Sequence, residues 1–176
     1  ALEDQERKIV TAINGLDADV IGLSEIEDGY AVTGDFAQRD KALKHLTEKL
    51  NEAAGSEKWA FVPSPSQDAV PDSPDVIRTA FIYRLDSVRP EGPSLILMDD
   101  AYANARQPLA QKFVAKDARG SFVAVANHFK SKGSLANDDK KNEDKGDGQG
   151  RNADVRTAQS NALLKHLGEQ NQWADL

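Results

Sequence analysis

Apolar residues recur with the spacing of amphipathic helices in three segments of the chain. The segments are residues 3–16, 38–54 and 153–169, and their expected core-facing positions are Ile9, Ala12, Ile13 and Leu16, then Leu43, Leu46, Leu50 and Ala53, then Val155, Ala158, Ala162, Leu163 and Leu167. Acidic residues open the first segment and Gly55 follows the second, as expected at a helix start and a helix end. The spacing therefore predicts three helices.

Runs of strand-forming residues lie between these helices. We expect strands over residues 19–26, 59–62, 76–83, 109–115 and 122–129, and an edge strand or hairpin over 87–98, where Pro90, Gly92 and Pro93 interrupt the run. The first run is almost continuously apolar, which is typical of a buried central strand. The order helix, strand, helix, several strands, helix predicts an α/β fold with a mixed, mostly antiparallel sheet.

A long polar segment, residues 131–152, joins the last strand to the last helix. It is dense in Asp, Lys, Asn and Gly, and we expect Leu135 to be its only apolar anchor. Such charges are better solvated than packed, so the segment is predicted to be a flexible loop. A calcium loop is the alternative, but no starting point places Gly at the sixth position and Glu at the twelfth, as an EF-hand requires.

Composition narrows the class of protein. A chain of 176 residues with 39% hydrophobic residues is long enough for one domain with a hydrophobic core. The net charge of -7 disfavours a typical basic nucleic-acid-binding module, although an enzyme acting on phosphodiesters needs only a local cationic patch. The absence of cysteine excludes a disulfide scaffold, thiolate catalysis and Cys-ligated zinc. No apolar run approaches the roughly 20 residues of a membrane span.

Two carboxylates, Glu25 and Glu27, end the first predicted strand. Because strand side chains alternate, both are expected on one face, with Ile26 on the other. The ends of strands are where open α/β sheets place functional sites, and Mg²⁺ prefers carboxylate oxygen. Two acids that merely solvate a strand end have the same spacing, so the spacing leaves both interpretations open.

A histidine and an arginine are the other candidates for chemistry. His128 ends a predicted strand, and a histidine there can protonate a leaving oxygen or hold a phosphate, while the lysines that follow supply positive charge. Arg106 precedes the predicted hairpin and could clamp a phosphate. A half-buried structural histidine and a surface arginine are the competing interpretations. His45 and His166 lie on predicted helices and are expected to be structural.

Taken in order, several segments resemble bacterial extracellular nucleases of the endonuclease/exonuclease/phosphatase superfamily. The resemblance is carried by residues 7–27, 75–84, 105–109, 127–133, and 146–150 followed by Arg156. It implies a four-layer α/β/β/α sandwich of the deoxyribonuclease I type, of which residues 1–176 are the N-terminal portion. It also implies a secreted, Mg²⁺-dependent phosphodiesterase that acts on DNA, with RNA as an alternative substrate and Mn²⁺ or Ca²⁺ as alternative metals.

The resemblance assigns roles to individual residues. Five positions match the family's site: Glu25 as catalytic metal ligand, His128 as the catalytic histidine at the scissile phosphate, Arg106 as a phosphate contact, and Asn127 and Lys130 as weaker substrate-binding candidates. Glu27 matches a second acid of the family, to which we assign no role. Related deoxyribonucleases use a further Glu to orient the histidine, and no counterpart occurs near Ile77.

Other parts of the family's site have no match in this chain. The family uses an upstream strand ending in Asn, a downstream Gly-Asp-x-Asn segment and a later Asp-His pair, and neither Gly34-Asp35 nor Gly146-Asp147 continues in that way. We therefore expect this chain alone to be inactive, and to self-associate through an uncovered sheet face or to form a partly open sandwich. Two other functions stay open: a phosphoesterase for phospholipids or small molecules with the same fold, and a non-catalytic module that retains the fold.

Overall fold

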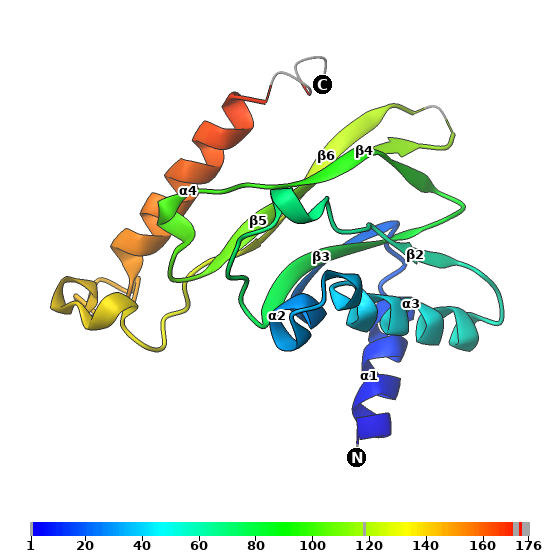
Figure 1. The fold of residues 1–176 in the computed structure, drawn as a ribbon, viewed down its shortest axis with the longest axis horizontal. Helices are drawn as coiled ribbons and strands as arrows, with labels where there is room; N and C mark the ends of the chain where they lie inside the picture. The colour runs from blue at the N-terminus through cyan, green and yellow to red at the C-terminus, as the bar shows by residue number, and fades with distance from the viewer. Residues whose placement is uncertain (1, 118, 171–172, 174–176) are drawn as a thin grey trace.

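Two antiparallel sheets facing each other form the centre of the molecule (Figure 1). The computed structural model describes residues 2–117, 119–170 and 173. The first sheet has the order β1-β3-β2 and consists of β1 (Val20–Glu27), β2 (Trp59–Phe61) and β3 (Ile77–Arg84). The second has the order β4-β5-β6 and consists of β4 (Val88–Ile96), β5 (Arg106–Ala115) and β6 (Ser121–His128).

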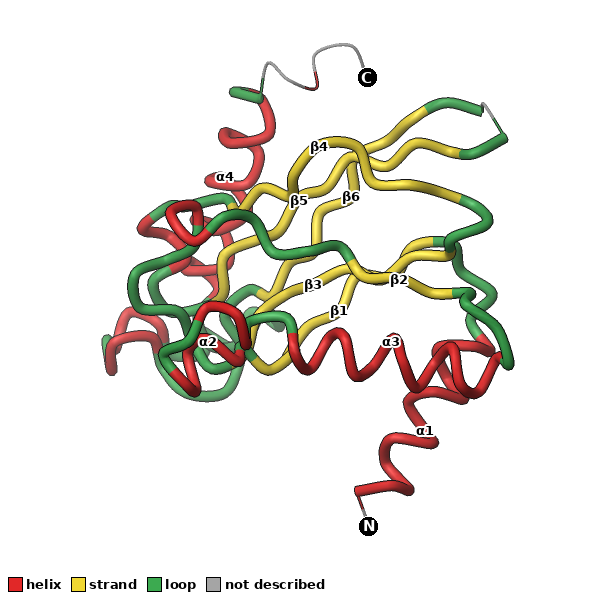
Figure 2. Tube along the Cα trace, turned by 45° about the vertical axis from the view of Figure 1, so that its right-hand side comes forward, coloured by secondary structure: helices red, strands yellow, loops and turns green. Residues whose placement is uncertain are grey.

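The helices lie outside these sheets. They are α1 (Leu2–Gly15), α2 (Gly29–Thr33), α3 (Lys41–Ala54) and α4 (Ala153–Gly168), and short 3₁₀ turns include η1 (Phe36–Gln38), η2 (Gln67–Ala69), η3 (Asp100–Tyr102), η4 (Ala136–Asp138) and η5 (Lys140–Asn142). Figure 2 shows α1 and α3 against the first sheet, and α4 lies beside the second. The fold is thus the α/β arrangement of two packed sheets with outer helices that the sequence predicts. No helix in the described part of the chain is long and apolar enough to cross a membrane.

Two hydrophobic clusters hold the layers together. The first joins the helices to the first sheet and contains Val10, Ile13, Leu43, Leu50, Trp59, Ala80 and Ile82. The second fills the space between the sheets and contains Val62, Phe81, Val88, Leu109, Phe113 and Ala126. Along β3, Ala80 and Ile82 therefore face the helices while Phe81 faces the second sheet, as strand alternation requires.

The prediction that residues 19–26 form a central strand is wrong, because β3 occupies the centre of its sheet and β1 lies at an edge of the described strands. The apolar run of β1 has another cause. Ile21 and Leu23 pack against the helix-side cluster, and Val20 packs against the cluster between the sheets. These contacts account for the apolar positions, although none of the residues of β1 is fully buried.

The predicted core faces of the helices are correct only in part. In α1, Val10 and Ile13 are buried, whereas Ile9 and Leu16 are 51% and 62% exposed. Ala53 of α3 and Ala158 of α4 are also exposed. In α4 the fully buried residue is Gln159, a polar side chain that the apolar spacing passes over.

Four buried or half-buried charges connect the end of β1 to β3. Asp28, only 1% exposed, caps α2 by accepting hydrogen bonds from Tyr30 and Ala31 and forms an ion pair with Arg39. Arg78 donates to Asp40 at 2.6 Å, and Ser64 links the two pairs through hydrogen bonds with Arg39 and Asp40. Burial lowers the pKa of both arginines, and the carboxylates of Asp28 and Asp40 oppose this shift.

We expect Arg39→Met to lower the free energy of unfolding by about 3–5 kcal/mol, because Asp28 would stay buried without its cationic partner. Urea denaturation measures the change. Arg89→Met is the matched control, since Arg89 is 54% exposed and pairs with Glu91 at the surface, and it should change stability by about 1 kcal/mol or less. Equal losses for the two variants would contradict a stabilising role for the buried pair.

Candidate functional site

The ends of four strands bring the candidate residues together at one edge of the two sheets. Glu25 lies near the end of β1, Asp75 precedes β3, Arg106 begins β5 and His128 ends β6. Arg106 and His128 are direct partners in the antiparallel pairing of β5 and β6, so their side chains project to the same face. That face is turned toward the first sheet, where Glu25 and Asp75 lie.

A β-bulge aims Glu25 at the second sheet. Leu23 pairs with Ala80 and Ile26 with Arg78, so two residues of β1 lie opposite one of β3. Glu25 has a φ of 60°, a conformation that costs a non-glycine residue free energy. The extra residue returns Ile26 to the helix side, beside Leu23. Ile26 thus faces the helices while Glu25 faces the second sheet, as expected of these two residues, but the regular alternation is broken between Leu23 and Glu25.

His128 and Glu25 meet across the two sheets. The His128 Nε2 lies 3.7 Å from Glu25 Oε1, within ion-pair range when the ring is protonated but too long for a hydrogen bond. The side chains are 23% and 68% exposed, respectively. The other ring nitrogen, Nδ1, is buried and has no hydrogen-bond partner among the described residues. Glu25 is thus the acid in contact with the histidine, at the nitrogen that faces the first sheet.

Arg106 is held by an acid that the sequence reasoning missed. Its Nη2 lies 3.1 Å from Asp75 Oδ2, and Asp75 also accepts a hydrogen bond from the backbone N–H of Ile77. The Arg106 Nε is buried and has no partner within the described residues. Asp75 opens one of the segments that carry the family resemblance, and its position just before a buried strand was the available signal. The guanidinium is therefore fixed at one end and keeps N–H groups for an anion.

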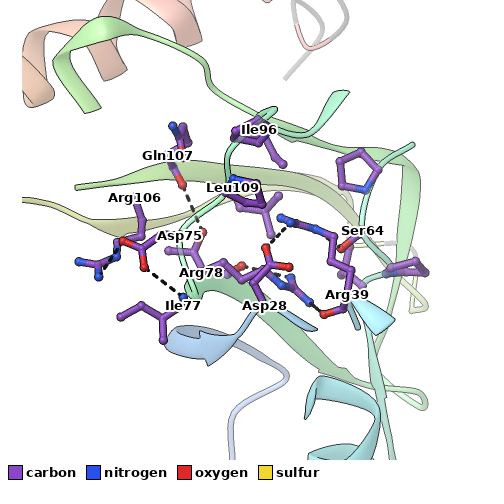
Figure 3. Close-up of a pocket in the computed structure, with 16 residues that line it drawn as sticks. Asp28, Arg39, Ser64, Asp75, Ile77, Arg78, Ile96, Arg106, Gln107 and Leu109 are labelled. Carbon is purple, nitrogen blue, oxygen red and sulfur yellow. Dashed lines mark hydrogen bonds and ion pairs between the residues drawn. The ribbon is translucent and has the colours of Figure 1, made fainter. Parts of the chain in front are cut away.

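A small cavity lies beside this ion pair. Its volume is about 30 Å³, and Asp75, Arg106 and Gln107 line it together with prolines of the 63–74 loop and the buried charges around Arg78 (Figure 3). Glu25 and His128 are not among its lining residues. The structure thus brings Glu25, His128 and Arg106 to one edge, but only Arg106 opens into this cavity.

A second bulge lies directly across from the first. Arg106 pairs with His128 and Leu109 with Ala126, so Gln107 and Pro108 lie opposite Asn127 alone. Pro108 cannot donate a backbone hydrogen bond, which a bulge tolerates better than a regular ladder does. Thr79 donates from its hydroxyl to the carbonyl of Gln107 at 3.4 Å and so connects the two irregular segments across the sheets.

The other predicted site residues lie farther from the contact between His128 and Glu25. Asn127 is exposed on the opposite face of β6 from His128, and its amide donates to the carbonyl of Val125. Lys130 lies in the turn after β6, where its ammonium donates to Ser134. Glu27 is exposed at the end of β1. The structure therefore does not bring Asn127 to the other site residues, and it gives Glu27 no contact with His128.

The residues present suit a divalent cation only in part. The Glu25 carboxylate is a hard oxygen donor and is largely exposed. Within the described ranges, no group of three or more His, Asp or Glu side chains is arranged to hold a metal ion. Mg²⁺ commonly uses one or two carboxylates and keeps several waters beside substrate phosphates. Glu25 therefore fits as one protein ligand of an ion completed by water and substrate oxygen.

The polar segment 131–152 is tied to the body by buried asparagines. Asn152 is fully buried; its side chain accepts from Ala136 N and donates to the carbonyl of Ser131. Asn142 is 4% exposed and donates to the carbonyl of Ala136. The expectation that Leu135 is the only anchor is wrong, because Ala136 and two polar side chains also serve. The flexibility of this loop stays a prediction.

Comparison with known proteins adds a likeness of fold. The sequence matches no family model and no curated protein. Two crystal structures are similar to part of this chain. Both are of ANGEL2, a 2′,3′-cyclic phosphatase, and one holds adenosine-2′,3′-vanadate.

The similarity to ANGEL2 is distant. Sequence identity is 11% for both structures, with TM-scores of 0.40 and 0.39, over 71% of this chain and 31% of that one. The chain thus spans about a third of the structure that it matches. A likeness at this level assigns neither a family nor a function to this chain.

The positive φ of Glu25 leads us to expect a particular order of stability among variants at this position. Glu25→Gly should be more stable than Glu25→Ala by about 1 kcal/mol, because glycine adopts this backbone conformation without steric cost. Glu27, whose φ is not positive, is the matched control. There the order should reverse, with Glu27→Gly less stable than Glu27→Ala by about 0.5–1 kcal/mol. Thermal unfolding of the four variants measures both differences, and the same order at both positions would argue against the strained bulge.

Proposed function

We propose that this chain is part of a secreted, metal-dependent phosphodiesterase that hydrolyses nucleic acid, with DNA as the preferred substrate. The observation that carries the proposal is the contact between His128 and Glu25 across the two sheets, with Arg106 as the direct strand partner of His128. A proton carrier, a hard oxygen ligand and a guanidinium are three kinds of group that together can support phosphodiester hydrolysis. The family resemblance of the sequence supports the same assignment.

The proposed roles follow from the positions of the atoms. An imidazole can transfer a proton near neutral pH, and Nε2 of His128 is the ring nitrogen turned toward the edge shared by both sheets. His128 gives a proton to the leaving oxygen as the bond between phosphorus and that oxygen breaks. The attacking water oxygen bonds to phosphorus and releases a proton to solvent, and the imidazole takes up a proton from solvent again. Arg106 donates N–H groups to a non-bridging phosphate oxygen, and its pairing with Asp75 limits its rotation.

Glu25 is the residue that would hold the cation. A bound Mg²⁺ supplies charge stabilisation at the phosphoryl oxygen and the leaving group. The bulge is what sends this carboxylate toward His128 rather than toward the helices. The carboxylate and the imidazole therefore approach the same phosphate from different sheets.

Plasmid cleavage by the full-length protein tests the proposal. We expect His128→Ala and Glu25→Gln to lower the rate of plasmid cleavage by about 10²–10⁴-fold with Mg²⁺ present. Circular dichroism should show that both variants keep the fold. His45→Ala is the matched control, since His45 also faces a glutamate, Glu6, at 3.4 Å but lies on the outer helix α3. It should keep its rate within about twofold of the unaltered protein, as expected of a surface substitution.

Parallel assays separate the competing functions. Plasmid DNA, structured RNA, phospholipid vesicles and a small phosphodiester are each tested with Mg²⁺, Mn²⁺ and Ca²⁺. Turnover only of the lipid or the small ester, lost in His128→Ala, would retain the site and reject the nucleic-acid substrate. A full-length protein without turnover under any of these ions would support a non-catalytic module. Detection of the protein in the culture fluid of its source tests secretion.

The inactivity of these 176 residues alone stays a prediction. The isolated chain should give no cleavage at an enzymatic rate with any of the three cations, because residues that act as one site lose orders of magnitude in rate when some are missing. Cleavage that disappears in His128→Ala would show that the chain suffices. Sedimentation of the same sample measures whether it self-associates.

A further inference from the structure

Gln159 of α4 contacts both chain segments that lead to the candidate site. It is fully buried, although a glutamine on an amphipathic helix is usually exposed. Its Oε1 accepts a hydrogen bond from the backbone N–H of Lys130 at 2.9 Å, and its Nε2 donates to the carbonyl of Ala101 at 3.0 Å. Both ends of the amide are therefore satisfied by backbone, which determines the orientation of the side chain.

Both partners of Gln159 lie close in sequence to site residues. Lys130 follows His128 by two positions, and Ala101 belongs to η3, which precedes Arg106. The chain between η3 and β5 is short and is held by a hydrogen bond from Ala105 N to the carbonyl of Tyr102. Gln159 thus connects the segment after His128 to the segment before Arg106.

Backbone hydrogen bonds between β5 and β6 alone hold the Arg106–His128 end of the two strands only weakly. The pair Arg106–His128 is the last in the β5–β6 register, and the bulge at Gln107 and Pro108 separates it from the regular pairs that follow. Terminal pairs of a ladder have few neighbouring hydrogen bonds and open most easily. The amide of Gln159 has the same donor and acceptor as a peptide group, so it joins the two segments where backbone pairing has ended.

Aromatic packing supports the same connection. The Tyr102 ring stacks on Phe129, with centroids 6.3 Å apart and an interplanar angle of 26°. The Tyr102 hydroxyl donates to the backbone carbonyl of Gln159 at 3.1 Å, and Tyr102 is fully buried. On the preceding turn of α4, Arg156 donates to the carbonyl of Lys130 at 3.5 Å. The segment after His128 is therefore held from both sides by η3 and α4.

We propose that Gln159 is a positioning residue, which keeps His128 and Arg106 at a set separation by joining the two segments that carry them. It touches neither the reacting atoms nor the proposed metal ligand. Its effect on rate rests on the proposed function, whereas its effect on the His128 ring does not. A positioning residue is expected to change kcat more than KM, because it alters alignment rather than substrate contacts.

The test compares two buried glutamines in the full-length protein. Gln159→Leu removes both side-chain hydrogen bonds at nearly constant volume. Gln111→Leu is the matched control, because Gln111 is 1% exposed and its amide donates to the carbonyls of Glu91, Gly92 and Lys112, outside the candidate site. Gln111 differs in that its side-chain oxygen has no hydrogen-bond partner among the described residues, so this control tests for effects of losing buried amide donor bonds outside the site.

Two measurements separate positioning from stability. In Gln159→Leu we expect kcat for plasmid cleavage to fall about 10- to 100-fold with KM changed less than about threefold, and the NMR resonance of the His128 ring to shift. Gln111→Leu should leave the kinetics and the His128 resonance as in the unaltered protein. An unshifted resonance in Gln159→Leu, or equal shifts in both variants, would overturn the inference.

A second variant of Gln159 and the activity of His128→Ala complete the experiment. If Gln159→Leu does not fold, Gln159→Glu keeps the shape and the acceptor for Lys130 N but loses the donor to Ala101. It should shift the His128 resonance in the same assay, and no shift would again reject the role. If His128→Ala retains full cleavage, the proposed function fails, and the resonance alone then decides whether Gln159 positions the ring.

Discussion

The packing of the two sheets across Phe81, Phe113 and Ala126 is the interaction on which the rest of the structure depends. Phe81 comes from β3, and the other two residues come from β5 and β6, so burying them sets both the distance and the relative orientation of the sheets. With that geometry the end of β1 meets the end of β6. Glu25 and His128, which are far apart in sequence, are then near each other without any direct link along the chain.

Polar side chains and bulges fix the positions of individual residues, which the apolar packing of the sheets sets only approximately. The bulges in β1 and β5 redirect single residues at the sheet edge, and the hydrogen bond from Thr79 to Gln107 connects them. Gln159 and Asn152, both fully buried, join loops that have no ladder of their own. A buried amide without partners would cost about 1–3 kcal/mol, so these side chains specify one arrangement of the loops rather than simply adding stability.

The fold was largely predictable because periodicity reports burial. The helices α3 and α4 and the strands β1, β2, β3, β5 and β6 lie close to the predicted ranges, since each buries a face whose spacing is visible in the sequence. Short elements were missed. The helix α2 and the 3₁₀ turns depend on caps such as Asp28, whose buried partner Arg39 is polar and so adds nothing to the apolar spacing. Apolar spacing also does not show which strands pair with each other in a sheet, so the edge position of β1 was not predictable.

The sequence by itself determined the layered α/β class, the strand-end positions of Glu25 and His128, and the position of Arg106 close to a strand start. Only the tertiary structure decided that Glu25 faces His128, because a positive φ and one extra residue after Leu23 turn this side chain away from the helix side that Leu23 faces. Asp75 and Gln159 likewise acquire their partners, Arg106 and Lys130, only when distant segments come together. Local periodicity encodes which face of an element is buried, whereas contacts between polar side chains depend on how the elements pack.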